Sequence, residues 1–360
     1  MKTKKIFIYL YKTKITYIVI SLIILTITVQ IVDFIELTQA NINKSNFSFN
    51  DIIKMSFLKM PFLINEILPF VIIISTSFYF KSLIDNNELV SIRNLGLSIF
   101  NIFYPVAFAV LSISIFSLFI LNPISSISMS YLQKISDNNK KSSLIKLSND
   151  NIWIKNKINN KVLYINAKNI NIKNMLLTDI MIIDNTHNNQ KLYFAEKGKI
   201  NEEFILLNKV QETDIKHNKN KSYDYKNIKI NFNQKDILNS LQYYKYTPFY
   251  KYYNYVNSMK KLNYLSSEII LYFLSEIFKP ILLISISFVV TGYVAKFKRN
   301  ENFFKTIFIA IGIGFIIFFI DKIIYSINAK NILTYIFIIL AIPLTSIILG
   351  IIFMLRVEKG

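Results

Sequence analysis

The chain has 360 residues, 52% of them hydrophobic, and a formal net charge of +20. This apolar fraction is too high for an ordinary soluble protein of that length, and the lack of cysteine excludes disulfides and thiolate metal sites. The positive charge does not by itself indicate a nucleic-acid partner, because the enriched Lys, Asn, Ile, Phe and Tyr all have AT-rich codons that a base bias favours together.

Six apolar segments are long enough to cross a membrane as helices. About 20 predominantly apolar residues are needed, because each helical residue rises ~1.5 Å and the hydrocarbon core is ~30 Å thick. The first run is too long for a signal peptide and no small-residue cleavage site follows it, so we expect it to remain as a span. The predicted spans are Ile15–Ile35, Phe62–Phe80, Phe100–Leu121, Ile269–Ala295, Phe303–Ile320 and Ile332–Met354.

The connector after the second span, residues 81–98, has a helical pattern of its own. Its apolar residues recur at helical spacing, and Asp85 and Glu88 share a face with Arg93. One interpretation is an amphipathic connector that lies on the membrane surface. The other is a docking helix for a cytoplasmic partner. The pattern alone favours the connector.

The polar stretch between the third and fourth spans is typical of an all-β domain. Regularly spaced short strands with Asn-, Lys- and Asp-rich turns predict an antiparallel sandwich or barrel. From Lys235 to Leu265 the pattern changes, and we expect a helical return to the membrane with Tyr243, Tyr244, Tyr246 and Tyr253 near the interface. The predicted strands are Asn151–Lys157, Lys161–Ala167, Leu176–Ile183, Lys191–Glu196 and Glu203–Leu207.

Several charges lie inside or at the borders of the predicted spans. Such charges are costly in a bilayer, so they either face a protein interior or a wet cavity, or extend to the interface. Glu276 and Lys279 are three residues apart and can pair with each other. Pro61, Pro69 and Pro280 are expected to kink their helices. The remaining charges of this kind are Asp33, Glu36, Glu66 and Asp321.

Basic residues in the short loops predict the orientation. They gather at both termini and after the second and fourth spans, which indicates cytoplasmic termini and an external central domain. On the cytoplasmic side these residues are Lys2, Lys4, Lys5, Lys12, Lys14, Lys81, Arg93, Lys296, Lys298, Arg299, Lys305, Arg356 and Lys359. The opposite loops have only Lys44, Lys54, Lys59 and Lys330.

The sequence has few residues that could carry chemistry. No phosphate-binding loop or nucleophile elbow is present, and His187 and His217 fit no metal-binding helix spacing. We therefore predict a protein that is not an enzyme and has no metal site. Any energy-driven work would depend on a separate subunit.

The motifs, taken in order, resemble the LptF/LptG family of lipopolysaccharide-export permeases. The stretch Asn87–Ser98 is similar to the family's S-E-L-V/I-x-x-x-x-x-G-x-S cytoplasmic coupling helix. The order of the motifs along the chain looks closer to that of LptG than to that of LptF. The G-x₆-D stretch of the fifth span and the W-x-K strand contribute most to this likeness. Further matches are Val32-Asp33, Pro61 and Pro69, Ile152-Trp153-Ile154-Lys155, Ile277-Phe278-Lys279-Pro280 and Gly314 to Asp321.

The resemblance implies a multi-pass permease subunit of an ABC transporter in the bacterial inner membrane. Such a transporter extracts lipopolysaccharide and passes it through a periplasmic β-jellyroll domain towards the outer membrane. The implied partners are an LptF-like homologous permease, an LptB-like ATPase dimer that binds the ATP, and LptC-like and LptA-like periplasmic proteins. No cofactor of its own is implied.

The resemblance also implies an organisation and two sets of site residues. Residues 1–122 would hold helices 1–3 with a coupling helix at about 82–98, residues 123–265 the jellyroll and residues 266–360 helices 4–6. For residues 81–98 the resemblance favours a docking helix over an amphipathic connector on the membrane surface. The residues implied for ATPase coupling are Glu88, Leu89, Arg93 and Gly96, and those implied for the lipid cavity are Asp33, Glu36, Glu66 and Asp321.

The chain also departs from the family pattern. Where some members meet lipid phosphates with lysine, this chain has Ile35, Glu36 and Phe62, so Lys59 or Lys134 would have to substitute, or the organism's lipid is less anionic. Two other functions stay open at this point. One is an extracytoplasmic-domain ABC permease of the lipoprotein-release or mechanotransmission type, and the other a non-transporting envelope scaffold or receptor.

Overall fold

The computed structural model describes most of the chain, which divides into two compact units, 1–132 with 270–360, and 133–269. The predicted loop residues Lys44, Lys298, Arg299 and Lys330, His187 and the side chain of Lys134 lie outside the described part. The residues described are 2–42, 48–137, 152–158, 161–171, 174–186, 189–201, 203–217, 219–296, 303–323 and 332–359.

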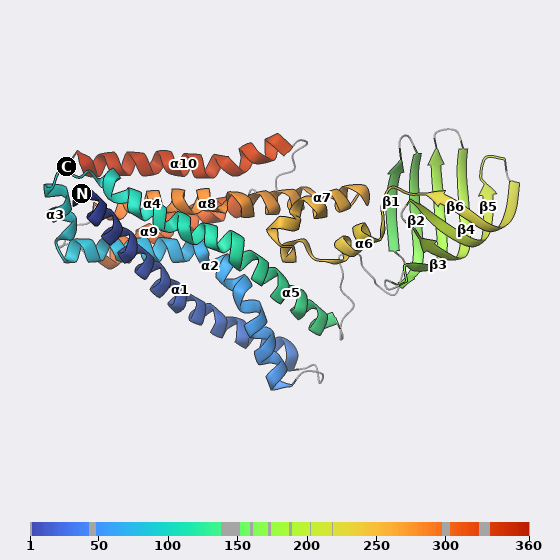
Figure 1. Cartoon of the computed structure of the whole chain (residues 1–360), viewed down its shortest axis with the longest axis horizontal. Coiled ribbons are helices and arrows are strands. Elements are labelled where there is room, and N and C mark those ends of the chain that lie inside the picture. The colour runs from blue at the N-terminus through green and yellow to red at the C-terminus, as the bar shows by residue number, and fades with distance from the viewer. Residues whose placement is uncertain are drawn as a thin grey trace. The chain divides into compact units, whose positions relative to one another are not determined.

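The first unit is a helical bundle (Figure 1). Six helices of the described residues are long and apolar enough to cross a membrane, which confirms the six predicted spans. The third span runs from α4 through a π-helical turn, η1, into α5. The helices are α1 Lys2–Ile42, α2 Phe49–Asp85, α3 Glu88–Asn94, α4 Ile99–Phe116, η1 Ser117–Leu121, α5 Asn122–Asp137, α8 Ser267–Val294, α9 Phe303–Ile323 and α10 Ile332–Glu358.

The long helix α2 illustrates how the sequence sets local structure. Ser48 and Asp51 form a capping box, which satisfies backbone N–H groups that have no partner in the first turn. The helix continues through Pro61 and Pro69, and it changes direction along its length (Figure 1). Each proline removes one backbone donor and frees a carbonyl one turn earlier, so side chains must supply the missing hydrogen bonds.

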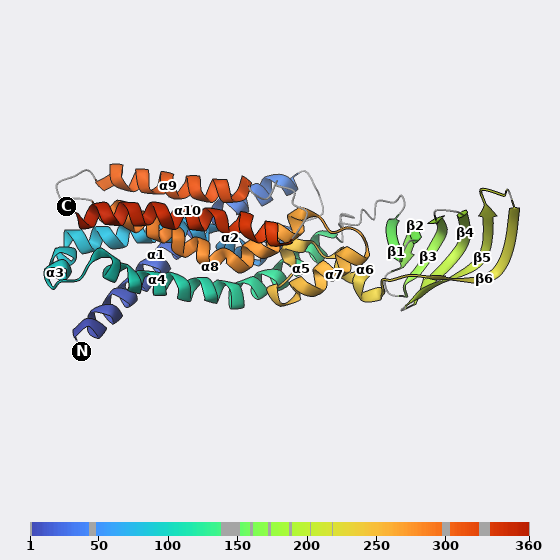
Figure 2. The ribbon, with the colours of Figure 1, turned by 90° about the horizontal axis from the view of Figure 1, so that it is seen from above.

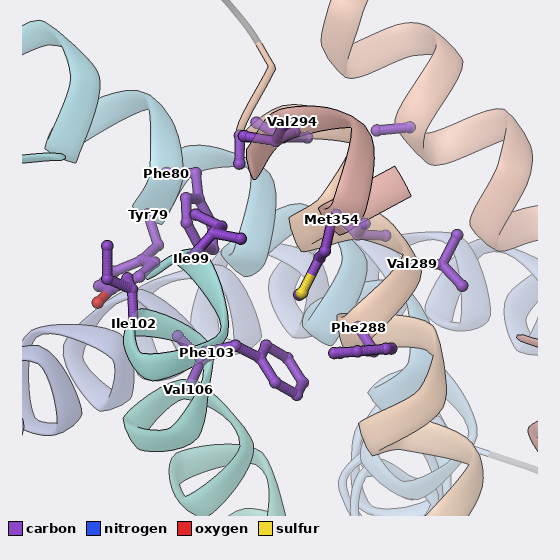
Figure 3. Packing of buried hydrophobic residues seen from close by; sticks show 14 of the residues in the cluster. Tyr79, Phe80, Ile99, Ile102, Phe103, Val106, Phe288, Val289, Val294 and Met354 are labelled. Carbon is purple, nitrogen blue, oxygen red and sulfur yellow. The ribbon is translucent and has the colours of Figure 1, made fainter. Parts of the chain in front are cut away.

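Buried apolar side chains from α2, α4, α8 and α10 pack together in the core of the bundle (Figure 3). The rings of Phe103 and Phe288 pack with centroids 4.6 Å apart. Tyr79 and Phe80 make an edge-to-face contact at 5.3 Å, a favoured aromatic geometry. The contact between Phe103 of α4 and Phe288 of α8 joins helices from the two halves of the sequence.

Glycines allow the backbones of α8 and α10 to approach closely within this core. A Cβ atom on Gly292 would lie 3.0 Å from the carbonyl oxygen of Gly350 and 2.8 Å from the Cβ atom of Phe353. Backbone atoms cannot rotate away as side chains can. The separation of these two helices therefore depends on the missing side chain at position 292.

The second unit contains a six-stranded antiparallel sheet in which neighbours in the chain are neighbours in the sheet (Figure 2). The antiparallel β domain is confirmed. Its described strands form one meander, whereas the sequence predicted a sandwich or barrel. Connections of two to four residues explain this topology, because they permit only hairpins. The strands are β1 Ile152–Ile158, β2 Lys161–Asn171, β3 Leu176–Thr186, β4 Asn189–Ile200, β5 Phe204–Asp214 and β6 Lys219–Lys229.

A row of buried residues crosses the sheet and ends on a charge. In register, the row is Ile154, Ile165, Ile182, Tyr193 and Glu212. Burial opposes ionisation of Glu212, but hydrogen bonds from two lysines of β4 and β6 outweigh it and keep the pKa of this carboxyl below its usual value. The last buried residue of this row is therefore a charged carboxylate that is paired with two lysines.

The strand β6 was not predicted from the sequence. Of its residues only Ile228 is buried, so the alternation of apolar and polar residues that indicates a strand is missing. This strand lies at one edge of the sheet and is solvated on both faces over most of its length. Pairing with β5 decides its conformation, and pairing is a tertiary property.

Residues after the sheet form short helices that lead to α8. Asn233 and Asp236 form a capping box that starts α6, and Tyr244 lies buried in η2. Of the four tyrosines expected at the interface, only Tyr253 is strongly exposed. The elements are α6 Gln234–Leu241, η2 Tyr244–Tyr246, η3 Phe249–Lys251 and α7 Tyr252–Lys261.

Replacing Gly292 by alanine should destabilise the bundle, because α8 and α10 must separate to admit the new methyl group. The expected cost is about 1–3 kcal/mol of unfolding free energy, measured by thermal unfolding in detergent. Gly312→Ala is the matched control, since no atom lies within 4 Å of its added Cβ and alanine favours helix. An equal loss of stability in both variants would contradict the close approach.

Candidate functional site

The connector between the second and third spans forms the short helix α3 at one end of the bundle. Leu89 and Ile92 are buried in the bundle core. Val90 and Leu95 remain exposed, and Glu88 is half-buried in the first turn. The helix thus has one face fixed to the protein and one face open.

Glu88 is held in place by the first helix. The hydroxyl of Tyr9 donates a hydrogen bond of 2.9 Å to Oε2 of Glu88. The carboxylate lies beside a mainly apolar hollow of about 380 Å³ between α1 and α3. The hollow is lined by Lys5, Ile6, Tyr9, Glu88, Ser91, Ile92 and Leu95. An acid at the rim of an apolar hollow suits a partner that has an apolar side chain next to a cation.

The far end of α3 is held by the last helix. A guanidinium nitrogen of Arg93 lies 3.4 Å from the carbonyl oxygen of Val357, in the last turn of α10 where carbonyls have no helical partner. The carboxylate of Glu358 in turn accepts a 3.1 Å hydrogen bond from the backbone N–H of Ile99. The end of α10 therefore forms hydrogen bonds with residues on both sides of the turn between α3 and α4.

Gly96 shapes that turn through its backbone alone. Its φ is +84°, in the left-handed region that favours glycine, and no atom lies within 4 Å of the position of a Cβ. Ser98 then caps α4 by accepting a hydrogen bond from the N–H of Asn101. Of the four residues implied for coupling, Glu88 is thus half-exposed beside the hollow, while Leu89, Arg93 and Gly96 fix the position of α3 and of the turn after it.

Gly96→Ala should destabilise the turn by roughly 1–2 kcal/mol, because an L-residue with a Cβ is strained at this φ. Gly96→Asn should lose much less, since asparagine tolerates the left-handed region. Thermal unfolding of both variants checks this. If the two variants lose equal stability, the backbone conformation is not what requires glycine at this position.

The four charged residues predicted for a lipid cavity differ in burial and in ion pairing. Asp33 is buried and ion-paired with Lys59. Glu66 lies 4.0 Å from Lys322, and Glu36 is exposed. Asp321 is buried near the end of α9. The contacts join Asp33 and Glu66 to separate lysines.

A buried polar network links α2, α8 and η1. Pro69 cannot donate to the carbonyl of Asn65, and the ammonium of Lys279 takes that place at 2.9 Å. Lys279 also lies 3.1 Å from Glu276, which is 7% exposed and accepts a 3.0 Å hydrogen bond from the Asn65 amide. Ser117 donates to the other side of that amide at 2.7 Å. The paired carboxylate and ammonium were predicted, whereas Asn65 and Ser117 were missed.

Lys14 is a second residue that the sequence did not reveal. It counted as a cytoplasmic loop charge, but it lies inside the span of α1 with 0% exposure. Its ammonium donates to the hydroxyls of Ser75 at 3.0 Å and Thr76 at 2.8 Å on α2. The only sequence signal would have been two hydroxyl residues in the facing span, and sequence alone does not say that the two helices face each other.

The buried network gives a quantitative expectation. Glu276→Ala and Lys279→Met should each cost about 3–5 kcal/mol of unfolding free energy, because each leaves one buried charge without its partner. The double variant should lose much less than the sum, which thermal unfolding in detergent will measure. Strictly additive losses would mean that the two side chains do not act as a pair.

The comparison with known families decides what this bundle belongs to. The family model "Lipopolysaccharide export system permease LptF/LptG" matches residues 8–356. The chain belongs to this family. No curated protein matches the chain significantly.

Family membership fixes the general role. LptF/LptG proteins are permease components of a lipopolysaccharide export system and are not themselves enzymes. With its six candidate spans, the chain is a multi-pass membrane protein. In the part of the chain that the structure describes, no group of His, Cys, Asp or Glu side chains could hold a metal ion.

Proposed function

We propose that this LptF/LptG protein is the LptG-side permease of an ABC transporter that extracts lipopolysaccharide from the bacterial inner membrane. A separate LptB-like ATPase dimer supplies the energy by docking on α3. Both termini lie in the cytoplasm and the β domain in the periplasm. The basic residues of the short loops support this orientation.

The observation that carries the proposal is the presentation of Glu88. The carboxylate is oriented by Tyr9 and lies at the rim of an apolar hollow. The helix that bears it is anchored by two buried side chains, so little conformational freedom is lost when a partner binds. A cation from the ATPase would pair with Glu88 while an apolar side chain fills the hollow.

The contacts of α3 also provide a route for force. A displacement of α3 pulls on α1 through Tyr9 and on α10 through Arg93. It moves α4 through the turn that contains Gly96. Three spans of the bundle therefore respond directly to one docking surface.

The six spans form half of a transporter, and an LptF-like permease supplies the other half. Exposed aromatic side chains on α9, Phe304 and Phe308 among them, provide apolar surface for lipid or for this second permease. LptC-like and LptA-like proteins would receive the lipid from the β domain. The motif order, including Trp153 and Lys155 in β1, favours the LptG assignment.

Within the described residues, the structure bears on one lysine considered for contact with the lipid phosphates. Lys59, one of the two lysines considered for this role, is engaged by Asp33. A phosphate would have to displace that carboxylate to reach the ammonium. Asp33, Glu36, Glu66 and Asp321 remain our proposed residues for the cavity wall, where they would shape its charge.

Reversing the charge of Glu88 tests the docking surface. Glu88→Lys should weaken ATPase recruitment by about tenfold or more, since a like charge replaces a paired one. Tyr9→Phe should weaken it less, because the carboxylate stays but is no longer oriented. Co-purification of the ATPase and lipid-stimulated ATP hydrolysis are the two measurements.

Asp85→Asn is the matched control. Asp85 is exposed, pairs with Lys81 at 2.5 Å and lies three residues before Glu88, so it tests a nearby charge change outside the hollow. Recruitment should survive this change. Normal recruitment and export in Glu88→Lys would show that the ATPase docks elsewhere.

A further inference from the structure

The segment between the sheet and α8 is basic and aromatic without any acidic residue. From Tyr243 to Lys261 it contains four lysines and no Asp or Glu. Its tyrosines differ in burial. Tyr244, Tyr252 and Tyr255 are buried and hold the segment together. Tyr250 and Tyr253 are exposed, and Tyr243 and Tyr246 are half-buried.

The exposed residues form one stripe along η3 and α7. Tyr250 and Tyr253 are 58% and 76% exposed, and they are three residues apart, so they share a helical face. Lys251 and Lys260 are exposed on the same segment. Lys260 follows Tyr253 by seven residues, two helical turns. The ammonium of Lys251 lies 6.0 Å from the ring centroid of Tyr250, so aromatic rings and ammonium groups lie together along the stripe.

The underside of the stripe is rigid. The hydroxyl of Tyr255 donates to the carbonyl oxygen of Gln242 at 3.0 Å. Ser258 donates to Asp236 at 2.7 Å, and Lys261 lies 3.2 Å from the same carboxylate. These contacts fix α7 on α6. The stripe is thus a preorganised surface and not a flexible linker.

The chain itself keeps this stripe close to a membrane. α7 ends at Lys261 and the spanning helix α8 begins at Ser267, so five residues separate them, a reach of at most about 18 Å. The hydroxyl of Tyr244 also donates to Glu268 in the first turn of α8 at 2.5 Å. The bilayer interface lies at the start of a spanning helix, within reach of α7.

We propose that the stripe Tyr250, Lys251, Tyr253 and Lys260 binds the anionic phospholipid headgroups of the bilayer around α8. Lysine ammonium groups pair with lipid phosphates, and tyrosine rings settle at headgroup depth with their hydroxyls in water. The absence of acidic residues in the segment favours a polyanionic surface over a mixed-charge protein partner. This inference does not depend on the docking of an ATPase on α3.

The lack of native cysteine allows a direct test. The exposed Asn254 is changed to cysteine in the full chain and labelled with a fluorophore, and the protein is placed in nanodiscs containing headgroup-nitroxide lipid. Phosphatidylcholine alone is compared with phosphatidylcholine plus phosphatidylglycerol. We expect stronger quenching in the anionic bilayer. Ser222→Cys on the exposed strand β6 is the control label and should be quenched in neither.

Two double variants separate the charge from the rings. Lys251→Ser with Lys260→Ser should reduce the ratio of docked to undocked protein by about fivefold per lysine and remove the preference for the anionic bilayer. Tyr250→Ser with Tyr253→Ser should weaken quenching in both bilayers. A circular dichroism spectrum confirms that each variant keeps its fold.

Three results would overturn the proposal. One is equal quenching at Asn254 and Ser222. Another is quenching at Asn254 that is the same in neutral and anionic bilayers. The third is quenching that appears only when purified lipopolysaccharide is added, which would assign the stripe to the transported lipid instead of the bilayer.

Discussion

The structure of the bundle depends on one constraint, that a backbone carbonyl in the hydrocarbon region must find a donor within the protein. Pro69 frees the carbonyl of Asn65, and the ammonium of Lys279 on α8 satisfies it. That ammonium needs a counter-charge, which Glu276 provides one turn earlier. A kink in the second span thus requires an ion pair in the fourth. The two halves of the bundle are joined by this requirement as well as by apolar packing.

The short helix α3 also depends on contacts with other helices. This helix has only seven residues, too few to be stable alone, so packing and tertiary hydrogen bonds hold it. Tyr9 reaches it from the first span and Val357 from the last. A short helix held at both ends moves with the helices that hold it. This property suits the coupling role that we propose for α3.

The second unit contains the sheet and the segment that leads from the sheet to the spanning helix α8. Its meander is built from hairpins, and its buried row ends on Glu212, whose charge is neutralised by lysines. After the sheet, α6 and α7 pack together and a tyrosine ties them to α8. Side-chain contacts therefore hold the segment after the sheet together, and we propose that its exposed stripe binds anionic headgroups.

The sequence by itself determined the six spans, the β domain between the third and fourth, and the position of α3, because apolar run length, strand spacing and motif order are local properties. It also placed Glu276 and Lys279 in reach of each other. It could not place Lys14 inside the bundle, because the hydroxyl groups that accept its hydrogen bonds lie on another helix. It could not predict β6, because that strand forms by pairing with β5. The partners of Asn65 on α8, Glu276 and Lys279, lie more than 200 residues away in the chain. Only the tertiary structure brings such residues together, since no local pattern records which helix faces which.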